Sequence, residues 1–282
     1  MSVAEAPDTL DRRRTGFDGE TALEALRGQV DATRFVPGRA ARVTVPETPL
    51  TRRTTGGADK ALLFGEPVTV ISESAGHAFV QSGWDGYVGY VTSDALGGAA
   101  ETTHHLVARA SHLYSEPHFK SRPLQTLSLG SALAGARIRD GFLETPDGFV
   151  PMQHVAERDV PKPILETALS LVDTPYLWAG NSAAGTDCSG LVQLAFRLAG
   201  HACPRDSDQQ AAEIGVGLPE GAALQAEDVI CWHGHVGLML DADRLLHANI
   251  HHMAVAIEPL EAALKRISAY EYGEVTTIRR LA

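Results

Sequence analysis

The chain has 282 residues, which is enough for more than one domain and for a sizeable hydrophobic core. Its formal net charge of -11 argues against nucleic acid and anionic membranes as main partners, because both favour proteins rich in Lys and Arg. The three cysteines, Cys188, Cys203 and Cys231, are odd in number and irregularly spaced, so they do not indicate a disulfide framework. No apolar run reaches the roughly 18 residues that a membrane-spanning helix needs.

Residues 1–40 are polar and start without the apolar segment of a signal peptide. The spacing of Leu23, Leu26 and Val30 predicts one helix over residues 21–30. We therefore expect an N-terminal arm that lies on the body of the protein. We also expect a cytoplasmic location, unless an export signal has been removed.

Residues 41–98 contain short runs of β-forming residues separated by Gly, Pro and charged turns. The predicted strands are Arg42–Val45, Leu62–Phe64, Val68–Ile71, Ala78–Val80 and Gly86–Val91. A weaker copy follows over residues 103–158, where Gly148-Phe149-Val150 repeats the pattern of Gly89-Tyr90-Val91. The spacing resembles that of bacterial SH3-like domains, which implies two small β-barrels in tandem over 41–98 and 103–158.

A charged, Pro-rich linker precedes residues 164–282, which read as a separate α+β domain. Helical periodicity comes first, over 164–172 and again from Cys188 to a stop at Gly200. An antiparallel meander is predicted after it, over residues 228–232, 235–240 and 244–248, with further strands at 254–257 and 275–278.

Cys188 lies in the first turn of its predicted helix, behind Asp187 in the N-cap position. Free amides and the helix dipole favour a thiolate there, so we expect a pKa lowered toward or below neutrality. A lone cysteine at a helix start is nevertheless more often a small buried residue than a nucleophile.

Two histidines favour the nucleophile. His235 opens an apolar strand, and His247 follows 12 residues later on the neighbouring strand. A hairpin through residues 241–243 would bring the two rings side by side. A cysteine, a histidine base and a third polar group in this order form the triad of papain-like folds.

Four segments carry a specific resemblance: P-Y-L-W-A-G, T-D-C-S-G-L-V-Q, G-H-V-G-L and L-L-H-A, all within residues 164–282. They resemble the NlpC-type cysteine peptidases of bacterial cell-wall peptides. The arm and the two SH3-like barrels match a subgroup similar to γ-D-glutamyl–diamino-acid endopeptidases. That subgroup acts on stem peptides with a free N-terminal L-Ala.

The resemblance implies that Cys188 is the nucleophile, His235 the base and His247 the third member of the triad. It also implies a cleft lined by Tyr176, Asp187, Ser189, Arg205, Asp206 and Ser207. In the subgroup the first barrel closes one end of the cleft, and Glu66 and Tyr87 are the candidates there for holding the substrate amine. No metal or organic cofactor is implied.

Simpler roles remain open for several of these residues. Tyr176 could be a core aromatic and Asp187 only a helix cap. Arg205 and Asp206 could form a surface ion pair, and Glu66 could serve only its turn. A zinc site is the rival for the histidines, because Cys231, His233 and His235 would share a face of a straight strand, and His247 could add a fourth ligand.

The expected function is therefore hydrolysis of the amide between γ-D-Glu and a diamino acid, diaminopimelate in the first instance. The substrates would be murein stem peptides returned to the cell. The partner is the stem peptide, with no nucleic acid and no membrane. Two other functions stay open: a non-catalytic protein that binds cell-wall peptide, and an acyltransferase that uses the same thioester chemistry.

Overall fold

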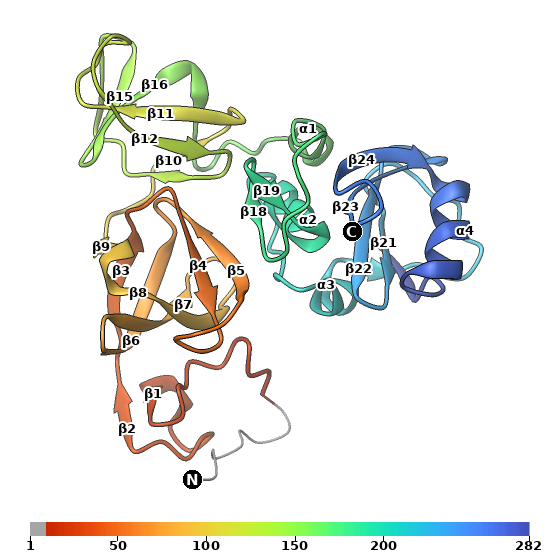
Figure 1. Cartoon of the computed structure of the whole chain (residues 1–282), viewed down its shortest axis with the longest axis horizontal. Coiled ribbons are helices and arrows are strands. Elements are labelled where there is room, and N and C mark those ends of the chain that lie inside the picture. Colours follow the sequence, from red (N-terminus) through yellow and green to blue (C-terminus); the bar gives the residue numbers. More distant parts are fainter. Residues whose placement is uncertain (1–9, 282) are drawn as a thin grey trace. The chain divides into compact units, whose positions relative to one another are not determined.

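The structure, a computed structural model, describes residues 10–281 and divides the chain into two compact units after Arg158 (Figure 1). The boundary falls in the segment that the sequence predicts to be a linker. Each unit has its own sheets and its own buried apolar residues. No helix in the described range is long and apolar enough to cross a membrane.

The first unit begins with a short arm, where the helix predicted over residues 21–30 is wrong. The arm instead forms β1 (Thr21–Leu23), a single 3-10 turn η1 (Glu24–Leu26) and β2 (Arg34–Val36), with β1 and β2 parallel. Leu23 and Val36 pack against a cluster of Ile71, Phe79 and Val88 on the neighbouring sheet. Burial against that sheet thus overrides the weak local helical periodicity.

A seven-stranded sheet with the order β5-β4-β8-β7-β6-β3-β9 follows the arm. Its strands are β3 (Arg39–Val43), β4 (Glu47–Thr51), β5 (Ala58–Leu63), β6 (Pro67–Ser74), β7 (His77–Ser82), β8 (Val88–Thr92) and β9 (Leu96–Gly98), with 3-10 turn η2 (Ser93–Ala95) before β9. Alternate residues point inward, so Val43, Leu50, Leu62 and Val80 form a common core. In the described part of the chain the outer strands β5 and β9 do not pair, so the sheet is SH3-like but not a closed barrel.

A buried ion pair lies inside this first sheet region. Lys60 Nζ lies 3.0 Å from Glu66 Oε1 and 2.7 Å from Asp85 Oδ2, and Ser82 Oγ donates to the same Glu66 oxygen at 2.5 Å. The Lys60 and Glu66 side chains have no exposed surface. A carboxylate enclosed in this way is not available to a substrate amine, so the structure gives Glu66 a structural role instead of the expected binding role.

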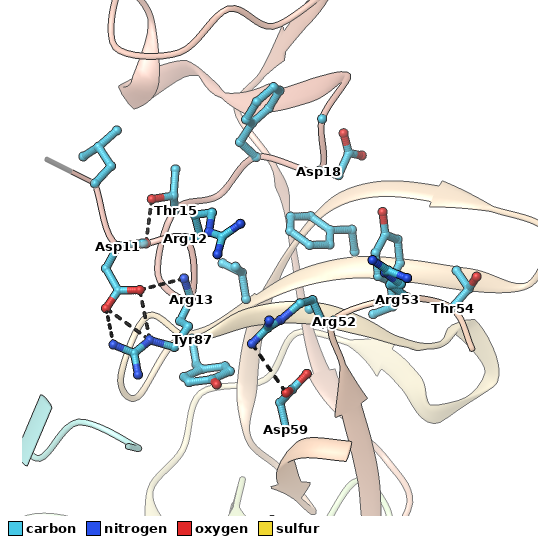
Figure 2. A pocket seen from close by; sticks show the side chains of 17 residues that line it. Asp11, Arg12, Arg13, Thr15, Asp18, Arg52, Arg53, Thr54, Asp59 and Tyr87 are labelled. Carbon is cyan, nitrogen blue, oxygen red and sulfur yellow. Dashed lines mark hydrogen bonds and ion pairs between the residues drawn. The ribbon is translucent and has the colours of Figure 1, made fainter. Parts of the chain in front are cut away.

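A hollow of about 980 Å³ lies between the arm and the first sheet, and Figure 2 shows its lining. Arg12 reaches it from the arm, and Arg52 and Arg53 reach it from the segment that follows β4. Tyr87, the other expected amine ligand, belongs to the lining, although little of its side chain is exposed. Its contact with substrate stays a prediction.

The rest of the first unit holds two smaller sheets with a second core. Their orders are β12-β11-β16-β15-β14 and β13-β10-β17. The strands are β10 (His104–Leu106), β11 (Ala110–Tyr114), β12 (Pro123–Ser128), β13 (Ala132–Leu133), β14 (Arg137–Arg139), β15 (Phe142–Thr145), β16 (Gly148–Pro151) and β17 (Val155–Glu157), with 3-10 turn η3 (Met152–His154). Leu106, Leu127 and Val150 form this core. These sheets are also open rather than closed within the described residues.

The second unit has the predicted α+β order, with helices first and a meander after them. The first part contains α1 (Ile164–Leu169), β18 (Asn181–Ser182), β19 (Gly185–Thr186), α2 (Cys188–Leu198) and α3 (Ser207–Glu213). A six-stranded sheet follows, with order β20-β25-β21-β22-β23-β24. Its strands are β20 (Val216–Gly217), β21 (Val229–Trp232), β22 (His235–Met239), β23 (Arg244–Asn249), β24 (Ala254–Pro259) and β25 (Thr277–Arg280).

Two helices of this unit are missing from the sequence-based prediction, the short α3 and the longer α4 (Leu260–Tyr270). The α4 helix follows β24 directly and buries Leu260, Ala263 and Ile267. These residues pack on Trp232 and Met239, so α4 covers one face of the sheet (Figure 1). The site described next lies partly on that face.

Candidate active site

The Cys188 side of the site is the start of α2. Asp187 has extended backbone angles and caps the helix, and its Oδ1 accepts a hydrogen bond from the Gly190 N–H at 2.7 Å. This is the N-cap role that the sequence predicts. Cys188 is the first residue of the helix, and only 7% of it is exposed.

Arg205 binds the carboxylate of the cap residue Asp187. Its Nη1 and Nη2 donate to Asp187 Oδ1 and Oδ2 at 3.0 and 2.7 Å, and Nη1 also donates to Ser189 Oγ at 2.7 Å. The Arg205 side chain is 1% exposed, so it supports the two residues beside the nucleophile instead of contacting a ligand itself. The alternative of a surface pair between Arg205 and Asp206 is wrong, because Arg205 is buried against Asp187.

Asp206 and Ser207 open the short helix α3. Asp206 is its N-cap and forms a capping box with Gln209. Asp206 and Ser207 keep part of their surface exposed. Substrate contacts by Asp206, Ser207, Asp187 and Ser189 stay predictions.

The histidine side of the site lies on β22 and β23. The register pairs Leu238 with Leu246 and Met239 with Leu245, which puts His235 and His247 on the same face of the sheet. His235 Nε2 and His247 Nδ1 are 2.8 Å apart. The side-by-side arrangement predicted from the hairpin is therefore found.

Gly237 lies between these two histidines along the same face. A Cβ atom at this position would come within 2.8 Å of Leu245 Cδ1 and 3.1 Å of His247 Cβ. The absence of a side chain thus leaves the space through which the His247 ring reaches His235.

Two charged residues extend the histidine pair. Glu258 Oε1 lies 2.7 Å from His247 Nε2, and Arg266 of α4 donates to both Glu258 oxygens at 2.5 and 2.8 Å. Burial acts to raise the pKa of Glu258, but the hydrogen bonds from His247 and Arg266 outweigh it and lower that pKa to about 2. The sequence-based prediction includes neither residue. The sheet register could have indicated Glu258, because Ala256 pairs with His247 and Glu258 is two residues further on the same face.

The two sides meet at the start of β22. The backbone N–H of Val236, the residue next to His235, is near enough to the Cys188 sulfur to act on the pKa of its thiol. Tyr272 stacks on the His235 ring, with centroids 4.8 Å apart and planes 8° from parallel. The charge of a Cys188 thiolate also acts on Tyr272, since it adds to the effect of burial in raising the Tyr272 pKa. Tyr272 is a further site residue that the sequence-based prediction omits.

The protonation state of Cys188 differs from the expectation. Burial, helped by the charge of the Asp187 carboxylate, raises the pKa of the Cys188 thiol to about 12. Hydrogen bonds from the Val236 and Ser189 amides and the charge of Arg205 act in the opposite direction but are weaker. The expected lowering toward neutrality is therefore wrong for the ligand-free site, because desolvation outweighs the helix start.

The histidines are neutral in the same state. Burial lowers the pKa of His235 well below its usual value, and the charges of His247 and Arg266 lower it further. Burial likewise lowers the pKa of His247, although Glu258 opposes this effect. The resting site thus contains a protonated thiol and a neutral imidazole, and the imidazole can act as a general base when a substrate arrives.

Tyr176 lies close to the nucleophile, as expected. Burial raises its pKa, and the charges of Cys188 and Asp187 raise it further. Its side chain keeps some exposed surface, so it is not a core aromatic alone. Contact with a substrate stays a prediction for this residue.

The geometry of the hairpin argues against the zinc alternative. Trp232 pairs with His235 and Cys231 pairs with Val236, so Cys231 and His235 face opposite sides of the sheet. His233 lies in the two-residue turn and is exposed. Among residues 10–281 no group of three or more His, Cys, Asp or Glu side chains is placed to hold a metal ion.

Known families and proteins match parts of both units of this chain. The model of the NlpC/P60 family matches residues 173–268, and the model of the bacterial dipeptidyl-peptidase Sh3 domain matches residues 52–96. Dipeptidyl-peptidase 6 of Lysinibacillus sphaericus is 28% identical over 71% of this chain and 83% of its own length. The γ-D-glutamyl-L-lysine dipeptidyl-peptidase of Bacillus subtilis is 33% identical, over 30% of this chain and 31% of its own length.

Solved structures show the same fold. The crystal structure of an NlpC/P60 family protein from Bacillus cereus superposes with a TM-score of 0.73 and 19% identity, over 86% of this chain and 99% of that chain. An NlpC/P60 endopeptidase from Photobacterium damselae gives a TM-score of 0.61 and 15% identity, over 85% of this chain and 70% of that chain.

Proposed function

Because the chain is a cysteine peptidase with an NlpC/P60 domain and a bacterial SH3 domain, we propose that it cleaves murein stem peptides at the bond between γ-D-Glu and a diamino acid. The arrangement of Cys188, His235 and His247 carries this proposal. The name of the Bacillus subtilis relative specifies a γ-D-glutamyl-L-lysine bond. Diaminopimelate is the diamino acid that we propose for this chain.

The chemistry follows from the resting state of the site. His235 takes the proton of the Cys188 thiol as the sulfur adds to the γ-carbonyl carbon of D-Glu. The C–N bond then breaks, the imidazolium gives its proton to the leaving amine, and a thioester remains. A water molecule, deprotonated by His235, hydrolyses the thioester and restores the thiol. The Cys188 N–H at the start of α2 is the proposed donor to the oxyanion.

A free N-terminal L-Ala is the second part of the proposal. Dipeptidyl-peptidases remove two residues from a free N-terminus, and two relatives carry that name. Glu66 is not the carboxylate that binds the amine, because it is enclosed with Lys60.

Recycling of wall fragments in the cytoplasm is the proposed role. Cys188, Cys203 and Cys231 are buried thiols outside any disulfide in the described part of the chain, which fits a reducing compartment. Fractionation of the producing cells, with detection of the native chain, tests the location. Recovery of the active protein outside the cell would contradict this part of the proposal.

The decisive experiment uses L-Ala-γ-D-Glu-diaminopimelate, its L-Lys analogue and the N-acetylated form of each, with products identified by mass. We expect L-Ala-D-Glu and free diamino acid from the two peptides with free amines. Equal cleavage of the acetylated forms would contradict the requirement for a free N-terminus. Binding without cleavage would favour a non-catalytic peptide-binding protein, and an amide product in the presence of added amine would favour acyl transfer.

A further inference from the structure

A continuous line of hydrogen bonds extends behind the proposed base. It runs from His235 through His247 and Glu258 to Arg266, with contacts of 2.8, 2.7 and 2.5 Å. Arg266 Nε also lies 2.8 Å from Glu271 Oε1. His235 and His247 are almost completely buried, and Glu258 is only 10% exposed. Water therefore does not replace these contacts.

The direction of each hydrogen bond in this line follows from Arg266 at its end, because an arginine side chain can only donate. Arg266 is a donor only, and it donates to both oxygens of Glu258, so Glu258 is an ionised acceptor. The contact between Glu258 and His247 then requires the proton on Nε2 of His247. A neutral ring carries one proton, so Nδ1 of His247 accepts a hydrogen bond from Nε2–H of His235. This leaves the lone pair of His235 on Nδ1.

The histidine pair alone does not set this direction. The same 2.8 Å contact is equally satisfied when His247 carries its proton on Nδ1 and donates to Nε2 of His235. In that arrangement His235 has its own proton on Nδ1. That nitrogen would then be a donor, and it could not take a proton from Cys188.

We propose that Glu258, held by Arg266, is a positioning residue that fixes the tautomers of His247 and His235 and so leaves Nδ1 of His235 as the proton acceptor. Only the expected effect on kcat rests on the proposed function. The tautomers themselves are a property of the ligand-free protein.

The first test is a long-range ¹H–¹⁵N spectrum of the unmodified protein labelled with ¹⁵N-histidine, at pH 7.5. Spectra of His235→Gln and His247→Gln assign the two rings. We expect both rings as the neutral Nε2–H tautomer. A signal showing His235 protonated on Nδ1 would overturn the proposal, and this reading needs no variant of Glu258.

The second test compares Glu258→Gln with Glu261→Gln, which replaces an exposed glutamate on α4. A neutral amide can donate as well as accept, so Glu258→Gln should populate the Nδ1–H tautomer of His235. We expect kcat on the stem peptide to fall about 10- to 100-fold with KM within about twofold, the direction seen when a triad loses its orienting carboxylate. Glu261→Gln should keep the tautomers and the rate.

Unchanged tautomers and kcat in folded Glu258→Gln would overturn the proposal. If the unmodified protein cleaves no stem peptide, the proposed function fails while the tautomer spectra still decide the present proposal. The two failures are therefore distinguishable.

Discussion

Arg205 and Asp187, the residue before Cys188, form a two-point ion pair with contacts of 3.0 and 2.7 Å and almost no exposure of the arginine. The same carboxylate caps α2 through the Gly190 N–H and accepts from the Ala179 N–H at 2.9 Å. One ion pair therefore fixes both the start of α2 and the loop before it.

Breaking this pair should destabilise the protein strongly. Arg205→Met leaves the Asp187 charge buried without its partner, so we expect a loss of about 3–5 kcal/mol in the free energy of unfolding. Urea unfolding measures this loss. Arg244→Met, which removes an exposed pair with Asp241, is the matched control and should cost no more than about 1 kcal/mol. A similar small loss for both variants would show that the buried pair does not support the helix start.

The raised pKa of the thiol gives a prediction for reactivity. Because the Cys188 pKa is about 12 and that of His235 is lowered, the thiolate fraction is small at pH 7. Alkylation of Cys188 by iodoacetamide should accelerate with pH from 6 to 10 without a plateau, and at pH 7 it should be slower than that of a free thiol. Mass spectrometry of modified Cys188, with Cys188→Ala as background, measures the rate. A plateau that begins below pH 7 would indicate a preformed thiolate–imidazolium pair instead.

The lowered pKa values of His235 and His247 also predict how stability depends on pH. The unfolded chain binds protons at these histidines below about pH 6.5, and the folded protein does not. The free energy of unfolding should therefore fall as pH decreases from 6.5, by up to about 1.4 kcal/mol per pH unit for each histidine. The contribution of Glu258 is separate, since it is lost only between about pH 4.5 and 2.

Urea unfolding at pH 7.5, 6.5, 5.5 and 5 measures this dependence. His247→Gln should reduce the slope below pH 6.5, because it removes one of the two groups. An unchanged slope in this variant would contradict the assignment.

How far the sequence predicts this protein depends on whether a feature is local. The positions of Cys188 at a helix start and of His235 and His247 side by side were predicted correctly, because a helix start and a short hairpin are set by neighbouring residues. The helix α4 could also have been predicted, since Leu260, Ala263 and Ile267 recur with helical spacing. The residues just before it, Ala254–Ile257, have a strand pattern, which favours sheet in this part of the chain.

Features that depend on burial could not be predicted. The pKa of Cys188 is raised because the folded chain encloses it, and this effect exceeds that of the helix amides seen in sequence. Glu66 looks like a turn residue, yet it pairs with Lys60 in the interior. Arg266 reaches Glu258 only because α4 packs back on the sheet. Each of these outcomes is set by tertiary contacts between residues that sequence patterns do not connect.

Gly237 offers a test of the histidine geometry that leaves every triad residue intact. The added methyl of Gly237→Ala would lie 2.8 Å from Leu245 Cδ1 and 3.1 Å from His247 Cβ, which is closer than ordinary van der Waals contact. The Leu245 methyl can rotate away, but His247 Cβ must give by a few tenths of an ångström, which disturbs the contact of its ring with His235. Because a displacement of about 1 Å can cost about 100-fold in rate, we expect this smaller shift to lower kcat by about 2- to 10-fold with little change in KM. The free energy of unfolding should also fall by about 1–3 kcal/mol through overpacking.

Stem-peptide kinetics and urea unfolding measure the two effects, with Gly98→Ala as a control, since a methyl there meets no atom within 4 Å. A folded Gly237→Ala with full activity would show that the close approach of His247 to His235 is not required for catalysis.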